Sequence, residues 1–135
     1  MNESDMLAIQ RLLSDFTWHA DAGDAERLSR LFVEDAVFLV GGKELRGRAQ
    51  ISEDCKQRFL VAGRKSRHVW SNLRVDPVGT HEARSTVVQL TFEQTAASDK
   101  TELRVNDIAD ELRKDADGNW RFARRTVSRQ MALHL

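Results

Sequence analysis

Few residues in this sequence have the types and spacing that metal chemistry requires. His19, Asp21 and His68 have the types of a two-histidine, one-carboxylate iron site. His19 and Asp21 lie two positions apart in a helical pattern, roughly 200° around the axis, so they cannot converge on one ion. We therefore expect no metal site.

The candidate nucleophiles lack the surroundings that activate them. Cys55 lies on the apolar face of a predicted helix, which indicates a buried, unreactive thiol. Ser66 and His68 share a strand face by alternation, but no nucleophile elbow surrounds Ser66. Gly41-Gly42 stands alone and is not a phosphate-binding loop. We expect no cofactor.

Polar residues in the second half follow strand alternation. His68, Trp70 and Asn72 share one face if no bulge intervenes, so Trp70 could supply an apolar wall and an indole N–H beside His68. The alternative for Trp70 is packing in the core or at a subunit contact. Arg104 and Asn106 also share a face, which either is solvated or lines a wet pocket.

Asp110 and Arg125 flank a predicted hairpin at Asp117-Gly118. A cross-strand salt bridge is favoured for them over a charged pocket floor. Because the protein is neutral overall, a solvated or intersubunit face is favoured over a nucleic-acid stripe for the basic run of Arg121, Arg124, Arg125 and Arg129.

The first half of the chain has mainly helical periodicity. Ser4 could cap a first helix whose apolar positions run from Met6 to Ala20, and Gly23 would end it. Asp21 lies on the border of its apolar arc. Further predicted elements are a short helix capped by Asp24 with Leu28, Leu31 and Phe32 buried, a strand over Ala36–Val40, and a helix from Gly47 to about Ala62.

The second half has the composition and turn signals of four long antiparallel strands. They cover Ser66–Pro77, Glu82–Thr95, Thr101–Lys114 and Asn119–Gln130. Strands of this length usually curl and contain bulges. We therefore predict an α+β fold, a cone-shaped barrel with three N-terminal helices packed on a strongly curved, mostly antiparallel sheet. A cone has a mouth, so the fold provides a concave site.

The composition describes one soluble domain spanning residues 1–135. Its 21 Lys and Arg balance 21 Asp and Glu, which argues against nucleic-acid binding. No apolar run is long enough for a membrane span, and with one cysteine and no visible signal segment we expect a cytoplasmic protein. Trp18 points away from the apolar arc of its helix, so we expect a contact surface and a homodimer or homotrimer.

Four segments together resemble the SnoaL-like division of the nuclear transport factor 2-like superfamily. They are the run from Asp21 to Ala36, Gly47 to Ile51, Arg67 to Val75, and Asp110 to Arg125 with its Asp-Gly-Asn-Trp turn. Their order and spacing are typical of that fold, which hosts many unrelated reactions.

The closest resemblance is to the branch of scytalone dehydratase and hexachlorocyclohexane dehydrochlorinase. That branch carries an aspartate at the end of the first helix and a histidine early in the first long strand, and Asp21 and His68 match these positions. The resemblance implies that His68 is a general base oriented by Asp21. Such a pair suits eliminations, dehydrations and isomerisations that begin by removing a proton from carbon.

The chain departs from this branch in having no tyrosine. Dehydratase relatives often place a tyrosine about where Phe16 or Thr17 stands, and Phe16 cannot donate a hydrogen bond. The absence also argues against ketosteroid isomerase chemistry. Candidate donors to a substrate are Trp70, Asn72, Arg104, Asn106 and Arg125.

Three functions remain open at the level of the sequence. The first is a cofactor-independent lyase or isomerase acting on a small, apolar, cyclic molecule, with Phe16, Trp70, Asn72, Asn106 and Arg125 as substrate-binding residues. The second is a structural subunit resembling the β subunit of aromatic-ring-hydroxylating dioxygenases. The third is a small-molecule binder or a polyketide-cyclase-like protein.

Overall fold

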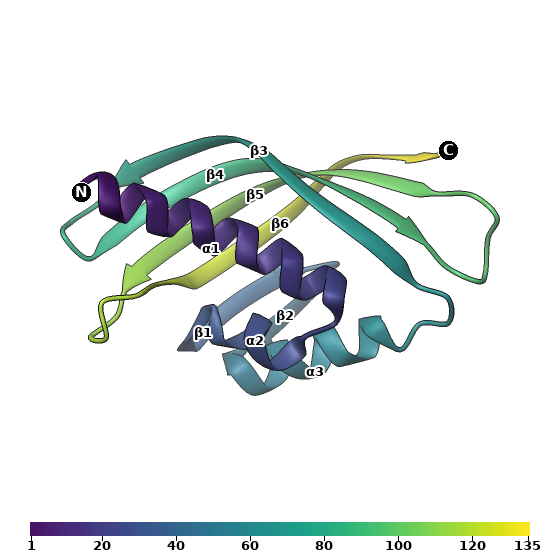
Figure 1. Cartoon of the computed structure of the whole chain (residues 1–135), viewed down its shortest axis with the longest axis horizontal. Helices are drawn as coiled ribbons and strands as arrows, with labels where there is room; N and C mark the ends of the chain where they lie inside the picture. Colours follow the sequence, from purple (N-terminus) through teal and green to yellow (C-terminus); the bar gives the residue numbers. More distant parts are fainter.

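A computed structural model describes all residues, 1–135, and shows helices packed against one face of a curved sheet (Figure 1). The elements in chain order are α1 (Glu3–Ala22), α2 (Ala25–Arg30), β1 (Phe32–Val40), β2 (Lys43–Arg46), α3 (Gly47–Phe59), β3 (Lys65–Pro77), β4 (Glu82–Gln94), β5 (Glu102–Lys114) and β6 (Trp120–His134). No helix is both long enough and apolar enough to span a bilayer.

The six strands form one mixed sheet in the order β2-β1-β6-β5-β4-β3. Only the β1–β6 pair is parallel. The sheet stays open, with β2 and β3 as its edges, so it is a cone without a closed wall. In Figure 1, α1 lies along the hollow of the long strands, while α2 and α3 lie beside β1 and β2. The predicted α+β class and mostly antiparallel sheet are confirmed.

The long strands curve at register shifts, as their length predicts. Shifts occur in β3 between Ser71 and Arg74, and between β5 and β6 in two places. Asn72 has φ 59° at the β3 shift, a left-handed conformation that Asn tolerates better than most residues. Because this bulge interrupts alternation, the prediction that Asn72 shares a face with His68 and Trp70 is wrong.

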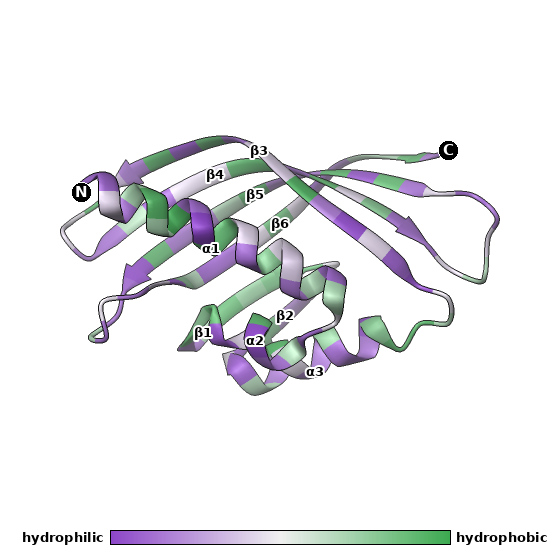
Figure 2. Cartoon of the chain, viewed as in Figure 1, coloured by the Kyte–Doolittle hydropathy of each residue, from purple (hydrophilic) through white to green (hydrophobic).

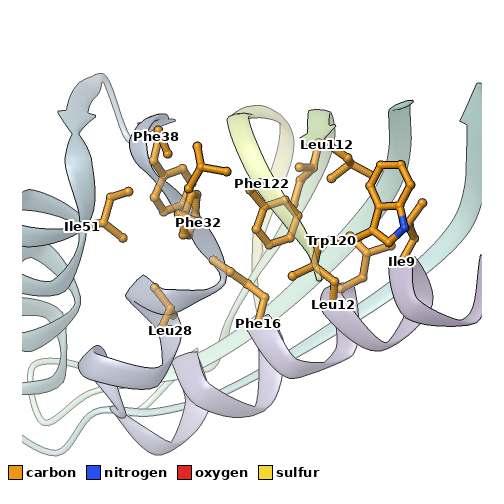
Figure 3. Close-up of a cluster of buried hydrophobic side chains, with 14 of the residues drawn as sticks. Ile9, Leu12, Phe16, Leu28, Phe32, Phe38, Ile51, Leu112, Trp120 and Phe122 are labelled. Atoms are coloured by element: carbon orange, nitrogen blue, oxygen red, sulfur yellow. The ribbon is translucent and has the colours of Figure 1, made fainter. Parts of the chain in front are cut away.

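The hydrophobic core lies between α1 and the sheet (Figure 3). Phe16 projects from α1 onto three phenylalanines in edge-to-face contacts, with ring centroids 5.9–6.2 Å apart: Phe32, Phe38 and Phe122. Each such side chain contributes about 1.5–3 kcal/mol when buried. The alternation of apolar and polar residues along the strands is visible in Figure 2. This packing sets where the last turn of α1 lies over the sheet.

The element ends differ from the predicted ones where capping and turns decide them. The N-cap of α1 is Asn2, in a capping box with Asp5, and not Ser4. Phe32 begins β1 and is not the end of a helix. Gly41 and Gly42 both have positive φ and form a hairpin turn into β2, which the sequence analysis missed. The third helix ends at Phe59, before Ala62.

Candidate active site

Asp21 is held in place by three hydrogen bonds at the C-terminal end of α1. The Ser66 hydroxyl donates to its Oδ1 at 2.9 Å, and the backbone N–H of His68 donates to its Oδ2 at 3.0 Å. The third contact joins Oδ1 to Nδ1 of His68 at 2.5 Å. A carboxylate at a helix C-terminus is disfavoured by the helix dipole. These donors offset that cost, and all of them come from β3.

The His68 ring is oriented with one nitrogen on Asp21 and the other available. Side-chain exposure is 11% for His68 and 8% for Asp21, so the contact is shielded from water. An ionised carboxylate only accepts hydrogen bonds, so it selects the tautomer with the proton on Nδ1. Nε2 then carries the free lone pair. This is the geometry required of a general base with an orienting carboxylate.

The electrostatics of Asp21 favour its ionised form. Partial burial acts to raise the pKa of the Asp21 carboxyl, but hydrogen bonds from the His68 ring, the His68 backbone and Ser66 outweigh it and lower the pKa. Asp21 therefore stays charged near neutral pH, as an orienting group must.

Gly23 makes this placement possible. It ends α1 with φ 68°, and its backbone N–H donates to the carbonyls of His19 and Ala20. A Cβ at this position would lie 2.1 Å from Cδ2 of Phe59. Glycine therefore allows α1 to end against α3 while Asp21, two residues earlier, faces β3.

The His68 ring lines a cavity of about 670 Å³. Nine of the 22 lining residues are hydrophobic, and they include Phe16, Leu28, Phe38, Ile51 and Val127. The remainder is glycine, polar or charged, so the lining is mixed, whereas the sequence predicted an apolar ligand. A cavity of this volume is in the range of small-molecule sites.

Two buried amides line the same cavity. Gln89 on β4 and Asn106 on β5 are direct cross-strand partners, and they are 4% and 6% exposed. Neither amide oxygen has a hydrogen-bond partner. Unpaired buried polar groups are rare and costly, so these amides are available to a ligand. Asn106 was predicted from the sequence and Gln89 was not, although strand alternation places Gln89 inward between Val87 and Thr91.

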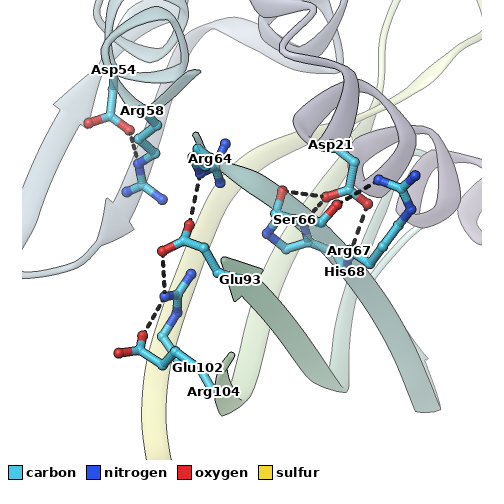
Figure 4. A network of polar contacts seen from close by, with 10 residues as sticks. All are labelled: Asp21, Asp54, Arg58, Arg64, Ser66, Arg67, His68, Glu93, Glu102 and Arg104. Atoms are coloured by element: carbon cyan, nitrogen blue, oxygen red, sulfur yellow. Dashed lines mark hydrogen bonds and ion pairs between the residues drawn. The ribbon is translucent and has the colours of Figure 1, made fainter. Parts of the chain in front are cut away.

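Charged side chains complete the lining in two groups (Figure 4). On one side, Asp54 of α3 pairs with Lys43 at 2.6 Å and with Arg58 at 2.8 Å. On the other side, Glu93 of β4 pairs with Arg64 at 2.8 Å and with Arg104 at 3.2 Å. Arg104 also contacts Glu102 at 2.6 Å.

Only some of the predicted substrate-binding residues line the cavity. Phe16 and Asn106 line the cavity with His68. Trp70 lies outside the lining, packs against the core, and donates its indole N–H to Ser14 of α1 at 3.1 Å. Asn72 is exposed and lies outside the lining. The bulge at Asn72 explains this difference.

Arg125 is fully buried beneath the cavity lining and not part of it. Its guanidinium lies 4.3 Å from the centroid of the Phe16 ring and 4.4 Å from that of Phe122. Nη1 of Arg125 contacts Oδ2 of Asp110 at 3.3 Å, so the favoured salt bridge is present. Complete burial raises the pKa of Asp110 to about 6, against the lowering effect of Arg125. Arg125 belongs to the basic run for which a solvated or intersubunit face was predicted. The prediction of a solvated face is wrong for Arg125.

Cys55 is buried among the lining residues of α3. Burial raises the pKa of its thiol, despite the nearby arginines. The thiol is therefore protonated near neutral pH, which agrees with the expectation that it is not a nucleophile.

Comparisons with known structures support the fold assignment. A protein named "Putative Scytalone Dehydratase" from Novosphingobium aromaticivorans superposes with a TM-score of 0.88 at 26% identity, over 98% of this chain and 88% of its own. A type 2 hexachlorocyclohexane dehydrochlorinase, LinA, superposes with a TM-score of 0.88 at 20% identity, over 98% of this chain and 89% of its own.

A third structure, named "putative aromatic ring hydroxylase" and also from Novosphingobium aromaticivorans, has a TM-score of 0.89 at 23% identity, over 100% of this chain and 96% of its own. At such identities LinA and the hydroxylase show the shared fold alone. No curated protein matches this sequence. The SnoaL-like domain family matches residues 3–126. The chain is therefore a member of the SnoaL-like domain family.

Proposed function

We propose that this protein is a cofactor-independent lyase or isomerase of the dehydratase type, in which His68 removes a proton from a carbon atom of a small molecule. The observation that carries the proposal is the 2.5 Å contact between His68 Nδ1 and Asp21 Oδ1 at the wall of the cavity. The 26% identical relative named as a scytalone dehydratase supports the same class of reaction.

The proposed step begins at Nε2 of His68. Its lone pair takes the proton, and the electron pair of the C–H bond forms a double bond as the leaving group departs from the neighbouring carbon. Asp21 stabilises the imidazolium that forms, without itself becoming protonated. The proton on Nε2 is then given to the departing hydroxide in a dehydration, to solvent when chloride leaves as an anion, or to another carbon in an isomerisation.

The buried amides supply the polar contacts that the absent tyrosine would supply in dehydratase relatives. Gln89 and Asn106 both line the cavity, and their amide oxygens have no protein partner. The side-chain NH2 group of each amide can donate to a carbonyl or leaving-group oxygen. Phe16, Phe38 and Ile51 provide the apolar surface for the rest of the substrate.

The test is turnover of a panel of cyclic β-hydroxyketones and chlorinated cyclohexanes, each with and without a carboxylate group, followed by loss of water or of chloride. His68→Gln removes the base and is expected to lower kcat by at least about 10³-fold, while Asp21→Asn is expected to lower it by about 10⁴-fold through the wrong tautomer. The matched control is His81→Gln, because His81 is an exposed histidine in the β3–β4 turn, away from the cavity.

Circular dichroism of each variant separates loss of chemistry from loss of fold. Turnover that survives in His68→Gln would contradict the proposal. A wild-type protein that eliminates nothing from either class would also contradict it, and would favour a structural-subunit or binding role.

A further inference from the structure

The lining of the cavity carries more positive than negative charge. Five basic side chains belong to the lining, and only two acidic ones do: Lys43, Arg58, Arg64, Arg104 and Arg129 against Asp54 and Glu93. Glu102, which contacts Arg104 from outside the lining, reduces the excess to two positive charges. The exposed members of this set, Lys43 and Arg129, mark the solvent side of the cavity.

The ion pairs of the arginines leave donors unused. Arg58 contacts Asp54 through Nε alone, and Arg64 contacts Glu93 through Nε alone, as Figure 4 shows. The terminal nitrogens of both guanidinium groups therefore have no protein partner. Arg129 forms no ion pair, although its side chain belongs to the same lining. A guanidinium group has five donors in a planar arrangement that matches a carboxylate.

The basic residues of the lining lie at different depths. Arg58 and Arg129 reach partly exposed positions, whereas the Arg64 side chain is 9% exposed and is as shielded from solvent as His68, Gln89 and Asn106. Asp54 and Glu93 belong to the same lining, and they would repel a doubly charged phosphate more than a singly charged group. The small positive excess therefore fits one carboxylate.

We propose that the ligand of this cavity carries a carboxylate, bound by the unpaired guanidinium nitrogens of Arg58, Arg64 and Arg129. This inference rests on the proposed function, because it takes the same cavity as the substrate site. The carboxylate holds one end of the substrate, so that an apolar body reaches inward past Phe16 to His68. The substrates that this inference predicts are small cyclic carboxylic acids.

The test compares 2-naphthoate with 2-naphthamide, which have the same shape and differ in charge. Isothermal titration calorimetry of the wild-type protein is expected to show naphthoate binding about tenfold more tightly. Raising the salt concentration should weaken the binding of naphthoate alone.

Arg129→Gln is the main variant, because Arg129 makes no ion pair that folding could depend on. It is expected to weaken naphthoate binding about tenfold and to leave naphthamide binding unchanged. The matched control is Arg124→Gln, because Arg124 lies on the same strand, is exposed, makes no ion pair and lies outside the cavity. This variant should bind both probes as the wild type does.

Equal affinity of the wild type for both probes would overturn the inference, as would no binding of naphthoate up to about 1 mM. An equal effect of Arg124→Gln and Arg129→Gln would overturn it as well. The same titrations on His68→Gln keep the two proposals distinct. Carboxylate selectivity in a protein without elimination activity would refute the proposed function alone, and His68-dependent elimination without selectivity would refute this inference alone.

Discussion

At the scale of single residues, the contact between Asp21 and His68 explains why a carboxylate occurs at an unfavourable helix end. The sequence indicated the pair only through its resemblance to related proteins, because a separation of 47 positions along the chain hides their proximity. Strand alternation placed Ser66 on the same strand face as His68. Its hydrogen bond to Asp21 was not predicted. Asn72 could not be placed, because a bulge reverses alternation without a sequence signal strong enough to locate it.

The lowered pKa of Asp21 predicts a pH-dependent contribution to stability. A carboxyl whose folded pKa lies below its unfolded pKa of about 3.9 stabilises the fold fully above that value. The contribution is lost as the pH falls further, through the lowered folded pKa. Asp21→Asn should therefore reduce the free energy of unfolding by about 1–2 kcal/mol at neutral pH, from weaker hydrogen bonds.

Urea denaturation of both proteins at about pH 7 and about pH 3 measures this difference. The difference in the free energy of unfolding between the wild type and Asp21→Asn should be smaller at the lower pH. A difference that stays constant or increases in acid would contradict this prediction. It would show that the hydrogen bonds to Asp21 do not stabilise its charged form.

At the scale of elements, α1 and β3 bring the site together, and their meeting depends on how α1 ends. Helix periodicity predicted α1 well, because its buried positions recur at helical spacing from Asp5 to Thr17. The β1–β2 hairpin escaped prediction because two short segments around Gly41-Gly42 carry little pattern of their own. The α3 end was also misplaced, since tertiary contacts decide where a helix stops.

Gly23→Ala tests the junction between α1 and α3. The new methyl group meets the Phe59 ring and requires a left-handed φ, so we expect a loss of at least about 1 kcal/mol in the free energy of unfolding and a lower kcat. Gly79→Ala is the matched control, because Gly79 lies in a turn with open space around it and no left-handed φ. Equal stability of the two variants would contradict this role for Gly23.

At the scale of the whole molecule, apolar residues form rows on the convex face of the sheet, opposite the cavity. Strand pairing aligns Val69, Leu90, Val105 and Met131 in one row across β3 to β6. Val69 is 50% and Met131 is 55% exposed. Phe92, Leu103 and Leu133 form a second row beside it. Sequence analysis anticipated an exposed apolar surface from Trp18, which is 71% exposed, but not from these rows.

We propose that this convex surface associates with further copies of the chain. Size-exclusion chromatography with light scattering should give two or three times the 15.4 kDa mass of one chain. Met131→Lys should shift the protein toward the monomer, whereas Val78→Lys, in the exposed β3–β4 turn, should not. A monomeric wild type, or dissociation by Val78→Lys, would contradict a homo-oligomer built on this face.

The tautomer of His68 tests the central claim most directly, because it needs no substrate. Nitrogen-15 NMR of the imidazole at about pH 9, where an ordinary imidazole is neutral, reports which ring nitrogen carries the proton. We predict a proton on Nδ1, shared with Asp21, and an unprotonated Nε2 facing the cavity, with this preference lost in Asp21→Asn. A proton on Nε2 in the wild type would leave His68 unable to act as the base, and would contradict the proposed mechanism.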